Sequence, residues 1–281
     1  MKLIFIFLAY GALLQAGSIE DAESYHRHST MQWNVAIQAI ERMPAFRNER
    51  VLDIGCGDGK ITAFLAARME KGSILGMDIS QSMIDFASAH YGSCEYPRLG
   101  FVRGSATEIP FKGRFDRVVS FSAMHWVLDQ ETAYREIYEA LVPGGSLSLH
   151  VYGDAPMNVV NVAETLIHSE KWACQFLSYE KQRVFLKKEK LKNLLEGVGF
   201  QRVEIVEFEG DTAFPDRASL IGFLRPVLAF ANHLPENRKQ EFIEEIADRI
   251  AFISGSTEDG LVHFRTLNFI ALGVKMPFST D

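Results

Sequence analysis

A glycine-rich turn at residues 55–59 is the feature that most restricts how this chain can fold. A short buried strand is predicted from Arg50, and it runs directly into Gly55-Cys56-Gly57-Asp58-Gly59. Apolar residues with helical spacing follow over residues 61–70. Glycine suits such a turn because it adopts positive φ and lets a ligand approach the backbone. The order of strand, glycine turn and helix predicts an α/β unit with a ligand site at the end of the strand.

Strands and helices continue to alternate along the chain as far as residue 152. Further strands are predicted over residues 74–79, 99–104, 115–121 and 146–152, with helices over 21–50, 81–91 and 131–141. Such alternation requires right-handed crossovers and produces a parallel sheet with helices on both faces. We therefore expect an α/β fold of the Rossmann-like type.

The C-terminal part, residues 153–281, has no second glycine turn. It is predicted to contain a helix over 187–196, a strand over 200–208, a mostly helical stretch over 216–253 and a last strand over 263–274. A helical insertion between two late strands fits this order better than a second domain, and we expect a lid over about 216–254. The phenylalanines of this stretch are expected either in its core or along an apolar pocket: Phe214, Phe223, Phe230, Phe242 and Phe252.

An acidic residue after the second strand indicates the kind of ligand. Asp78 comes 19 residues after Gly59, where a carboxylate accepts hydrogen bonds from both hydroxyls of a ribose. The glycine spacing departs from the G-x-G-x-x-G pattern for dinucleotides, and Asp53 and Asp58 flank the turn. These carboxylates repel a pyrophosphate but attract the amino group and the sulfonium of S-adenosylmethionine. The sequence therefore favours S-adenosylmethionine as the cofactor.

With these motifs the sequence resembles the class I S-adenosylmethionine-dependent methyltransferases, from about Tyr25 to Tyr152 and more weakly to the end. The resemblance implies a seven-stranded, mostly parallel sheet, and it places the methionine part of the cofactor on the turn and the ribose on Asp78. Ser105 stands where the family usually has Asp, which weakens one expected adenine contact and leaves the assignment intact. The positions implied to bind the cofactor are Tyr25, Gln32, Asp53, Gly55, Cys56, Gly57, Gly59, Asp78, Ile79, Met83, Ser105, Ala106 and Ser122.

The segment after the fourth strand, residues 121–129, resembles that of methyltransferases of the trans-aconitate, malonyl-carrier-protein and juvenile-hormone-acid type, which methylate carboxylates. The early segment over residues 25–33 resembles the N-terminal segment of the same enzymes. Together the two resemblances imply an acceptor site at Gln32, His125 and Trp126. We expect O-methylation of a small carboxylate, with His125 as the catalytic candidate where an acceptor needs a base. His125 as a hydrogen-bonded wall residue and Trp126 as a core residue are the alternatives. The alternative functions for the chain as a whole are methylation of a lipid, a quinone ring or a phenol, and cofactor binding without turnover, as in an exported protein.

Charge and cysteine content exclude other classes. The net charge of −7 is of the wrong sign for a protein whose main ligand is a nucleic acid, so we expect none as partner. The three cysteines form no Cys-x-x-Cys pair, and no acid or cysteine completes a metal set with His26 and His28. We therefore expect no metal site. The oligomeric state is left open.

The first eighteen residues resemble a secretory leader, with Lys2, an apolar run over residues 3–14 and small residues at 16–18. The run is too short for a membrane-spanning helix, so no stable membrane anchor is expected. An apolar N-terminal helix, or a true start near Met31, is the alternative to a cleaved signal peptide. Residues 19–281 are assigned to one methyltransferase domain with its cofactor-binding half at 45–152. The cofactor is a cytosolic metabolite, which favours the cytoplasm, whereas a cleaved leader favours export.

Overall fold

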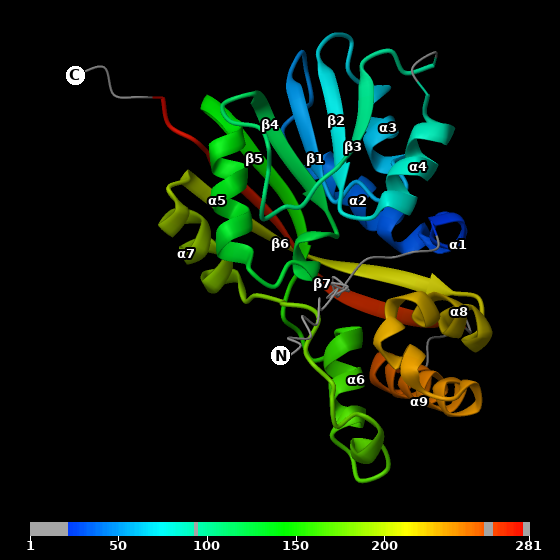
Figure 1. Ribbon diagram of the computed structural model, residues 1–281. Coiled ribbons are helices and arrows are strands. Elements are labelled where there is room, and N and C mark those ends of the chain that lie inside the picture. The colour runs from blue at the N-terminus through cyan, green and yellow to red at the C-terminus, as the bar shows by residue number, and fades with distance from the viewer. Residues whose placement is uncertain (1–21, 93–94, 256–260, 278–281) are drawn as a thin grey trace, which may run out of the picture.

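A seven-stranded sheet lies at the centre of the computed structural model, which describes residues 22–92, 95–255 and 261–277 (Figure 1). The predicted leader at residues 1–18 lies outside the described residues. The strand order is β3-β2-β1-β4-β5-β7-β6, with β7 antiparallel to both of its neighbours and the other neighbouring strands parallel. The strands are β1 (Arg50–Ile54), β2 (Ser73–Asp78), β3 (Leu99–Arg103), β4 (Phe115–Phe121), β5 (Leu141–Tyr152), β6 (Gln201–Phe214) and β7 (Val262–Val274).

The strand order reverses between β1 and β4. The chain runs outward from β1 through β2 to β3, then returns to the other side of β1 to form β4 and β5. In open α/β sheets the crevice at the carboxyl ends of the strands on either side of such a reversal is where ligands bind. The glycine turn after β1 and the segment after β4 are therefore the walls of the expected site.

Helices cover both faces of the sheet, which confirms the predicted Rossmann-like fold (Figure 1). One face carries α2 (Thr30–Arg42), α3 (Lys60–Ala66) and α4 (Gln81–His90), and the other carries α5 (Gln130–Ala140) and α7 (Lys188–Val198). Apolar positions at helical spacing produce each core, because the same side of the helix returns every three or four residues. Val118 on β4 packs in one core and its neighbour Val119 in the other, as alternation along a buried strand requires.

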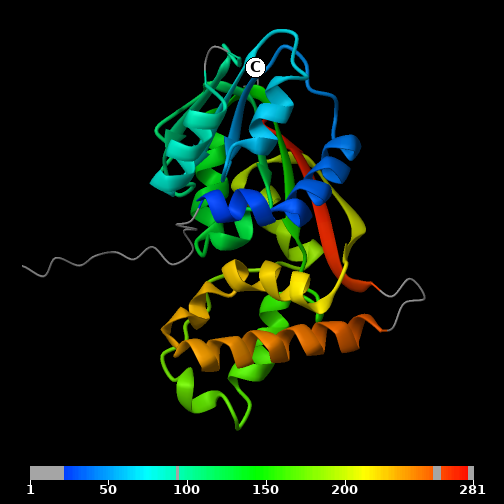
Figure 2. The ribbon, with the colours of Figure 1, turned by 90° about the vertical axis from the view of Figure 1, so that its right-hand side faces the viewer.

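A helical unit, here called the lid, lies beyond the carboxyl ends of the strands (Figure 2). It contains α6 (Val159–Ile167), α8 (Arg217–Val227) and α9 (Glu236–Ser254), with short 3-10 turns at Ala173–Gln175 and Ala229–His233. Its own core is aromatic: Phe242 is fully buried and meets the ring of Trp172 edge-on at 5.0 Å. The indole nitrogen Nε1 of Trp172 donates to Glu245 Oε2 at 2.6 Å, so the buried ring keeps a polar partner.

The helical insertion between β6 and β7 is confirmed, but several predicted details are wrong. The helix predicted over residues 21–50 is two helices, Ala22–His28 and Thr30–Arg42, and ends before Pro44. The helix predicted to reach residue 70 ends at Ala66, because tighter turns follow, such as Arg68 N–H to Leu65 O at 3.0 Å. The strand predicted to end at residue 208 runs on to Phe214, because its polar residues pair with β7. The pattern predicts no element over 159–176, yet α6 and Trp172 complete the lid core.

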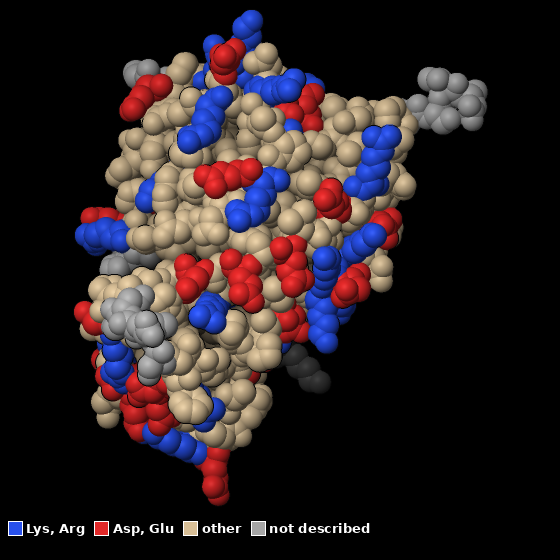
Figure 3. All heavy atoms as spheres, turned by 180° about the vertical axis from the view of Figure 1, so that it is seen from behind, with Lys and Arg blue, Asp and Glu red and all other residues tan. Residues whose placement is uncertain are grey.

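Charged side chains of both signs are interspersed over the face seen from behind, including the part formed by the lid (Figure 3). Ion pairs connect lid segments on the surface, such as Arg217 Nε with Asp248 Oδ1 at 2.6 Å and Lys171 Nζ with Glu241 Oε1 at 2.7 Å. Exposed pairs of this kind contribute little stability each, so the buried aromatic core accounts for the cohesion of the lid. Among the described residues, no helix is long and apolar enough to cross a membrane.

Candidate active site

The glycine turn lies where the sequence places it, between β1 and the start of α3. Gly55, Gly57 and Gly59 have φ of +72°, +54° and +78°, values that favour glycine over other residues. Space is also restricted, because a Cβ on Gly55 would lie 2.2 Å from the Cβ of Ala123 in the segment after β4. The amide of Gly55 donates to Met77 O at 2.7 Å, which fixes the turn against β2. The turn is thus a rigid backbone surface between the ends of β1, β2 and β4.

Asp78 ends β2 and is tied to this turn. Its Oδ2 accepts from the amide of Gly57 at 3.0 Å, and its Oδ1 accepts from the amide of Ser80 at 2.9 Å. Burial raises the pKa of Asp78, and these backbone hydrogen bonds oppose the rise. A carboxylate has about four acceptor positions, so each oxygen keeps capacity for one hydroxyl of a ribose. The geometry therefore fits the role that the sequence implies for Asp78.

The buried carboxyl group of Asp53 lies beside the turn, where the residues must fit a cationic cofactor. Its side chain is 1% exposed, and Thr62 donates to Oδ2 at 2.7 Å. The other oxygen, Oδ1, is buried and has no hydrogen-bond partner in the described part of the chain. Burial raises the pKa of Asp53 to about 7, although the hydrogen bond from Thr62 acts in the opposite direction and lowers it. An unpartnered buried carboxyl oxygen beside the turn is suited to an ammonium group, which S-adenosylmethionine carries on its methionine part.

The short helix α1 (Ala22–His28) covers the turn. The ring of Tyr25 lies 3.7 Å from where a Cβ on Gly57 would be, and burial raises the pKa of its hydroxyl. His26 Nδ1 lies 2.7 Å from Asp58 Oδ2, and the His26 ring packs on Phe86 of α4 with centroids 5.1 Å apart. Asp58 thus holds the cover in place, a partner that the sequence did not assign to His26.

We expect His26→Ala to weaken binding of S-adenosylhomocysteine about fivefold, because α1 loses a hydrogen bond worth about 1 kcal/mol. Isothermal titration measures the change. Arg27→Ala is the matched control, because Arg27 is exposed and its ion pair with a described residue is to Glu23 on the same helix, at 3.3 Å. Equal affinity of the two variants would contradict a role of the His26 contact in cofactor retention.

The remaining cofactor positions lie at the same edge of the sheet. Ile79 follows β2, and Met83 is buried on α4, whose N-terminus is capped by Ser80. Ser105 follows β3, and its Oγ lies 2.9 Å from Thr107 Oγ1, while Ala106 is partly buried. Cys56 is buried in the turn, and burial raises the pKa of its thiol well above the usual range. Their contacts with the adenine stay predictions, although their elements converge on one crevice.

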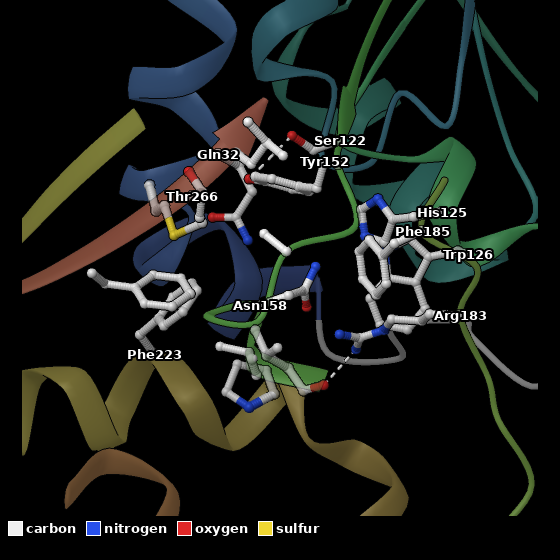
Figure 4. Close-up of a pocket in the computed structure, with 18 of the residues that line it drawn as sticks. Gln32, Ser122, His125, Trp126, Tyr152, Asn158, Arg183, Phe185, Phe223 and Thr266 are labelled. Carbon is white, nitrogen blue, oxygen red and sulfur yellow. Dashed lines mark hydrogen bonds between the residues drawn. The ribbon is translucent and has the colours of Figure 1, made fainter. Parts of the chain in front are cut away.

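A pocket between the sheet and the lid adjoins this crevice (Figure 4). Near the strand ends it is lined by Gln32, Ser122 and Tyr152, and the hydroxyl of Ser122 lies 3.4 Å from that of Tyr152. Ser122 has a φ of +53°, rare for a residue other than glycine, which is consistent with a constrained functional turn. Gln32 Oε1 is buried without a partner among the described residues. The pocket as a whole is lined by Tyr25, Met31, Gln32, Ser122, His125, Trp126, Tyr152, Gly153, Ala155, Asn158, Val159, Arg183, Phe185, Phe223, Pro226, Val227, Phe264, Thr266 and Leu267.

His125 and Trp126, which the sequence assigns to the acceptor site, lie on one wall of the pocket, and their contact with an acceptor stays a prediction. His125 is stacked on Phe185 with centroids 5.2 Å apart, and burial lowers its pKa well below the usual value. Its Nδ1 is buried and has no partner in the described part of the chain. His150, behind the pocket, bonds Asn268 Oδ1 at 3.0 Å, and burial lowers its pKa to about 4. Both imidazoles are therefore neutral at physiological pH.

Sequence reasoning missed part of the pocket. Arg183, Phe185 and Asn158 lie in irregular segments or at a helix start, where no periodicity marks them. Of the lid phenylalanines, Phe223 lines the pocket, Phe242 belongs to the core and Phe252 is 87% exposed. Core and pocket positions thus both occur, but the expectation is wrong for Phe252, which follows the buried Ile250 near the end of α9 and points into solvent. Among the described residues, no group of three or more His, Cys, Asp or Glu is placed to hold a metal ion.

The fold and the site together define a class: a Rossmann-like protein whose crevice at the carboxyl ends of β1 and β2 is suited to an adenosine cofactor with a cationic methionine part. A family model described as a methyltransferase domain matches residues 51–145. Juvenile hormone acid O-methyltransferase of Bombyx mori is 30% identical over 248 residues, which cover 82% of this chain and 86% of that protein. Trans-aconitate 2-methyltransferase of Delftia acidovorans is 24% identical, covering 88% of this chain and 96% of that protein.

Solved structures agree in fold. Phosphoethanolamine N-methyltransferase 2 of Haemonchus contortus, in complex with S-adenosyl-L-methionine, superposes with a TM-score of 0.60 at 19% identity, over 91% of this chain and 56% of that one. The chain belongs to the S-adenosylmethionine-dependent methyltransferases, and S-adenosylmethionine is its cofactor.

Proposed function

We propose that this enzyme transfers the methyl group of S-adenosylmethionine to a carboxylate oxygen of a small molecule. The observation that supports this most directly is the charge of the acceptor pocket. Its lining includes the guanidinium of Arg183 and no Asp or Glu among the described residues. A cationic pocket attracts an anionic acceptor and disfavours an ammonium. The names of the relatives described above, which refer to juvenile hormone acid and trans-aconitate, support the same class of acceptor.

The protonation state of the pocket supports an acceptor that needs no base. His125 and His150 are neutral because burial lowers their pKa values, and burial raises the pKa of Tyr152 to about 12. A carboxylate is already a nucleophile, so placement and removal of water supply most of the rate. Bound S-adenosylmethionine would supply an activated methyl group, and its transfer to a carboxylate would require no proton to be taken up by the residues of the pocket.

The pocket residues have positioning roles in this proposal. The amide of Gln32 and the indole N–H of Trp126 are donors suited to a carboxylate, and Tyr25 and Ser122 border both the cofactor turn and the pocket. His125, stacked on Phe185, holds the wall, and its buried Nδ1 has no partner among the described residues. Helix α1, which carries Tyr25, excludes water from the turn.

A matched set of acceptors tests the proposal: 3-phenylpropanoate, 4-propylphenol and 3-phenylpropylamine with methyl-labelled cofactor. We expect labelled product from the carboxylate and at least about tenfold less from the other two. Methylation of the phenol alone would overturn the proposal in favour of ring-hydroxyl chemistry. Binding of S-adenosylhomocysteine without transfer to any of these or to broader acceptor pools would favour a protein without turnover.

The pH profile gives a second measurement on the same reaction. In saturating S-adenosylmethionine, whose ammonium group would keep Asp53 ionised, we expect kcat/KM for a carboxylate acceptor to change less than about twofold between pH 6.5 and 8.5, because the transfer moves no proton. His125 and His150 are neutral over this whole range, since both pKa values are lowered. A rise of about tenfold per pH unit would instead indicate that an acceptor hydroxyl must lose its proton.

We propose that the enzyme works in the cytoplasm, where S-adenosylmethionine is made. Residues 1–18 retain the pattern of a leader, and mass spectrometry of the mature N-terminus distinguishes the alternatives. A mature chain that begins at Ile19 would show export.

A further inference from the structure

Arg183 is a buried cation with no acidic partner in the described part of the chain. Its side chain is 6% exposed, and burial lowers its pKa to about 9, so it stays protonated at neutral pH. Among residues 22–92, 95–255 and 261–277, no carboxylate lies within ion-pair distance of its guanidinium. The acid Glu164 forms an ion pair with Lys181, with Nζ 3.4 Å from Oε1, and accepts a hydrogen bond from the hydroxyl of Tyr179 at 3.4 Å. A buried charge left without a counter-charge is costly, which makes this position unusual for a purely structural residue.

The contacts that Arg183 does make hold it in place without neutralising it. Its Nη2 donates to the carbonyl oxygen of Val227 at the end of α8, and its guanidinium stacks on the Trp126 ring, 3.6 Å from the centroid. The next residue, Val184, donates its amide to His125 O at 2.8 Å, which fixes the segment beside the pocket wall. A guanidinium has five N–H donors, so donors remain for a ligand. The side chain is therefore oriented in advance, its guanidinium lines the pocket, and no described carboxylate compensates its charge.

The position of Arg183 in the pocket separates it from the reacting centre. Figure 4 shows Ser122 and Tyr152 on one side of the pocket and Arg183 on the other, next to the lid. The Ser122 side adjoins the cofactor turn, because Gly55 packs against Ala123. Apolar side chains such as Phe223, Val227 and Leu267 line the space as well. A carboxylate paired with a guanidinium is also a weaker nucleophile, so the oxygen to be methylated is better served by the neutral donors near Gln32.

We propose that Arg183 binds a second anionic group of the acceptor, so that the preferred substrates are dicarboxylates with an apolar body between their two acid groups. One carboxylate lies by Gln32 and Ser122 and is methylated, and the other pairs with Arg183 beneath the lid. The inference rests on the proposed carboxyl methylation and adds to it a residue that determines specificity.

Matched acids test this assignment. We expect the wild-type enzyme with S-adenosylhomocysteine to bind octanedioate at least about tenfold more tightly than octanoate or the monomethyl ester of octanedioate, by isothermal titration. The Arg183→Met variant should lose this difference and bind all three alike, and Arg183→Lys should keep part of it, because lysine retains the charge without the planar fork. The comparison of the three ligands on the wild type needs no variant, so it tests the proposal even where Arg183→Met does not fold.

The control is Arg217→Met, which removes a cation from the exposed start of α8, where Arg217 pairs with Asp248 at 2.6 Å. It should leave all three affinities unchanged. If Arg183→Met lowered the affinity for octanoate and octanedioate equally, Arg183 would hold the reacting carboxylate. If it lowered neither affinity, Arg183 would only connect the lid to the pocket wall. Either result overturns the proposal. Methylation of monoacids without preference for the diacid would overturn this inference alone, whereas a wild type that binds and methylates no acid would overturn the proposed function.

Discussion

Asp78→Ala is expected to weaken binding of S-adenosylhomocysteine about 100-fold or more. The carboxylate offers both oxygens to the ribose, and hydrogen bonds to a charged group are worth about 1.5–3 kcal/mol each. The same substitution releases the amides of Gly57 and Ser80, which Asp78 now holds at 3.0 and 2.9 Å. The turn then loses its link to the end of β2, so the rest of the binding surface becomes less ordered. Isothermal titration gives the affinity, and thermal unfolding shows whether the variant is folded.

Two further variants separate charge from shape. Asp78→Asn keeps one acceptor oxygen, and its affinity for S-adenosylhomocysteine should fall about tenfold. Asp85→Ala removes an acid from the exposed face of α4, where Asp85 accepts from Gln81 Nε2 at 2.8 Å, and should leave the affinity unchanged. If Asp78→Ala bound within threefold of the wild type, the ribose contact assigned to Asp78 would be wrong.

The parts of the site that the sequence predicts are those set by local spacing. Gly55, Gly57 and Gly59 follow β1 without a gap, and Asp78 ends the next strand, so strand prediction alone brings turn and acid to one sheet edge. The alternation of strands and helices likewise predicts the sheet up to β5. These features depend on neighbours in the chain, which periodicity and turn chemistry report directly.

The parts that the sequence does not predict depend on contacts between distant segments. His26 meets Asp58 only because α1 folds back over the turn, and a search for metal spacing around His26 misses a single acid 32 residues away. Arg183 lies in an irregular segment, and its missing counter-charge is visible only when its surroundings are known. The lid combines residues 159–176 with α8 and α9, and the first of these pieces has no long periodic pattern of its own.

The second large effect is expected at Gly55, where both conformation and space oppose a side chain. Gly55→Ala places a residue with Cβ at a φ of +72°, which costs about 1–2 kcal/mol, and brings that Cβ to 2.2 Å from the Cβ of Ala123. Overpacking of this kind costs about 1–3 kcal/mol more. We expect the free energy of unfolding in urea to fall by about 3 kcal/mol, and cofactor binding to be lost, because the turn must shift away from Met77 O.

Two comparisons divide this loss into its causes. Gly113→Ala has a similar φ of +54° but no atom within 4 Å of its Cβ, so it should show the backbone cost alone, about 1 kcal/mol. The double variant Gly55→Ala/Ala123→Gly removes the atom that the new Cβ meets, and Ala123 has a φ of −118° that imposes no strain on glycine. It should therefore recover stability and part of the cofactor affinity relative to Gly55→Ala. If the two substitutions were simply additive, the contact between the glycine turn and the segment after β4 would not be what fixes the crevice, and the cofactor site would depend on the conformation of the turn alone.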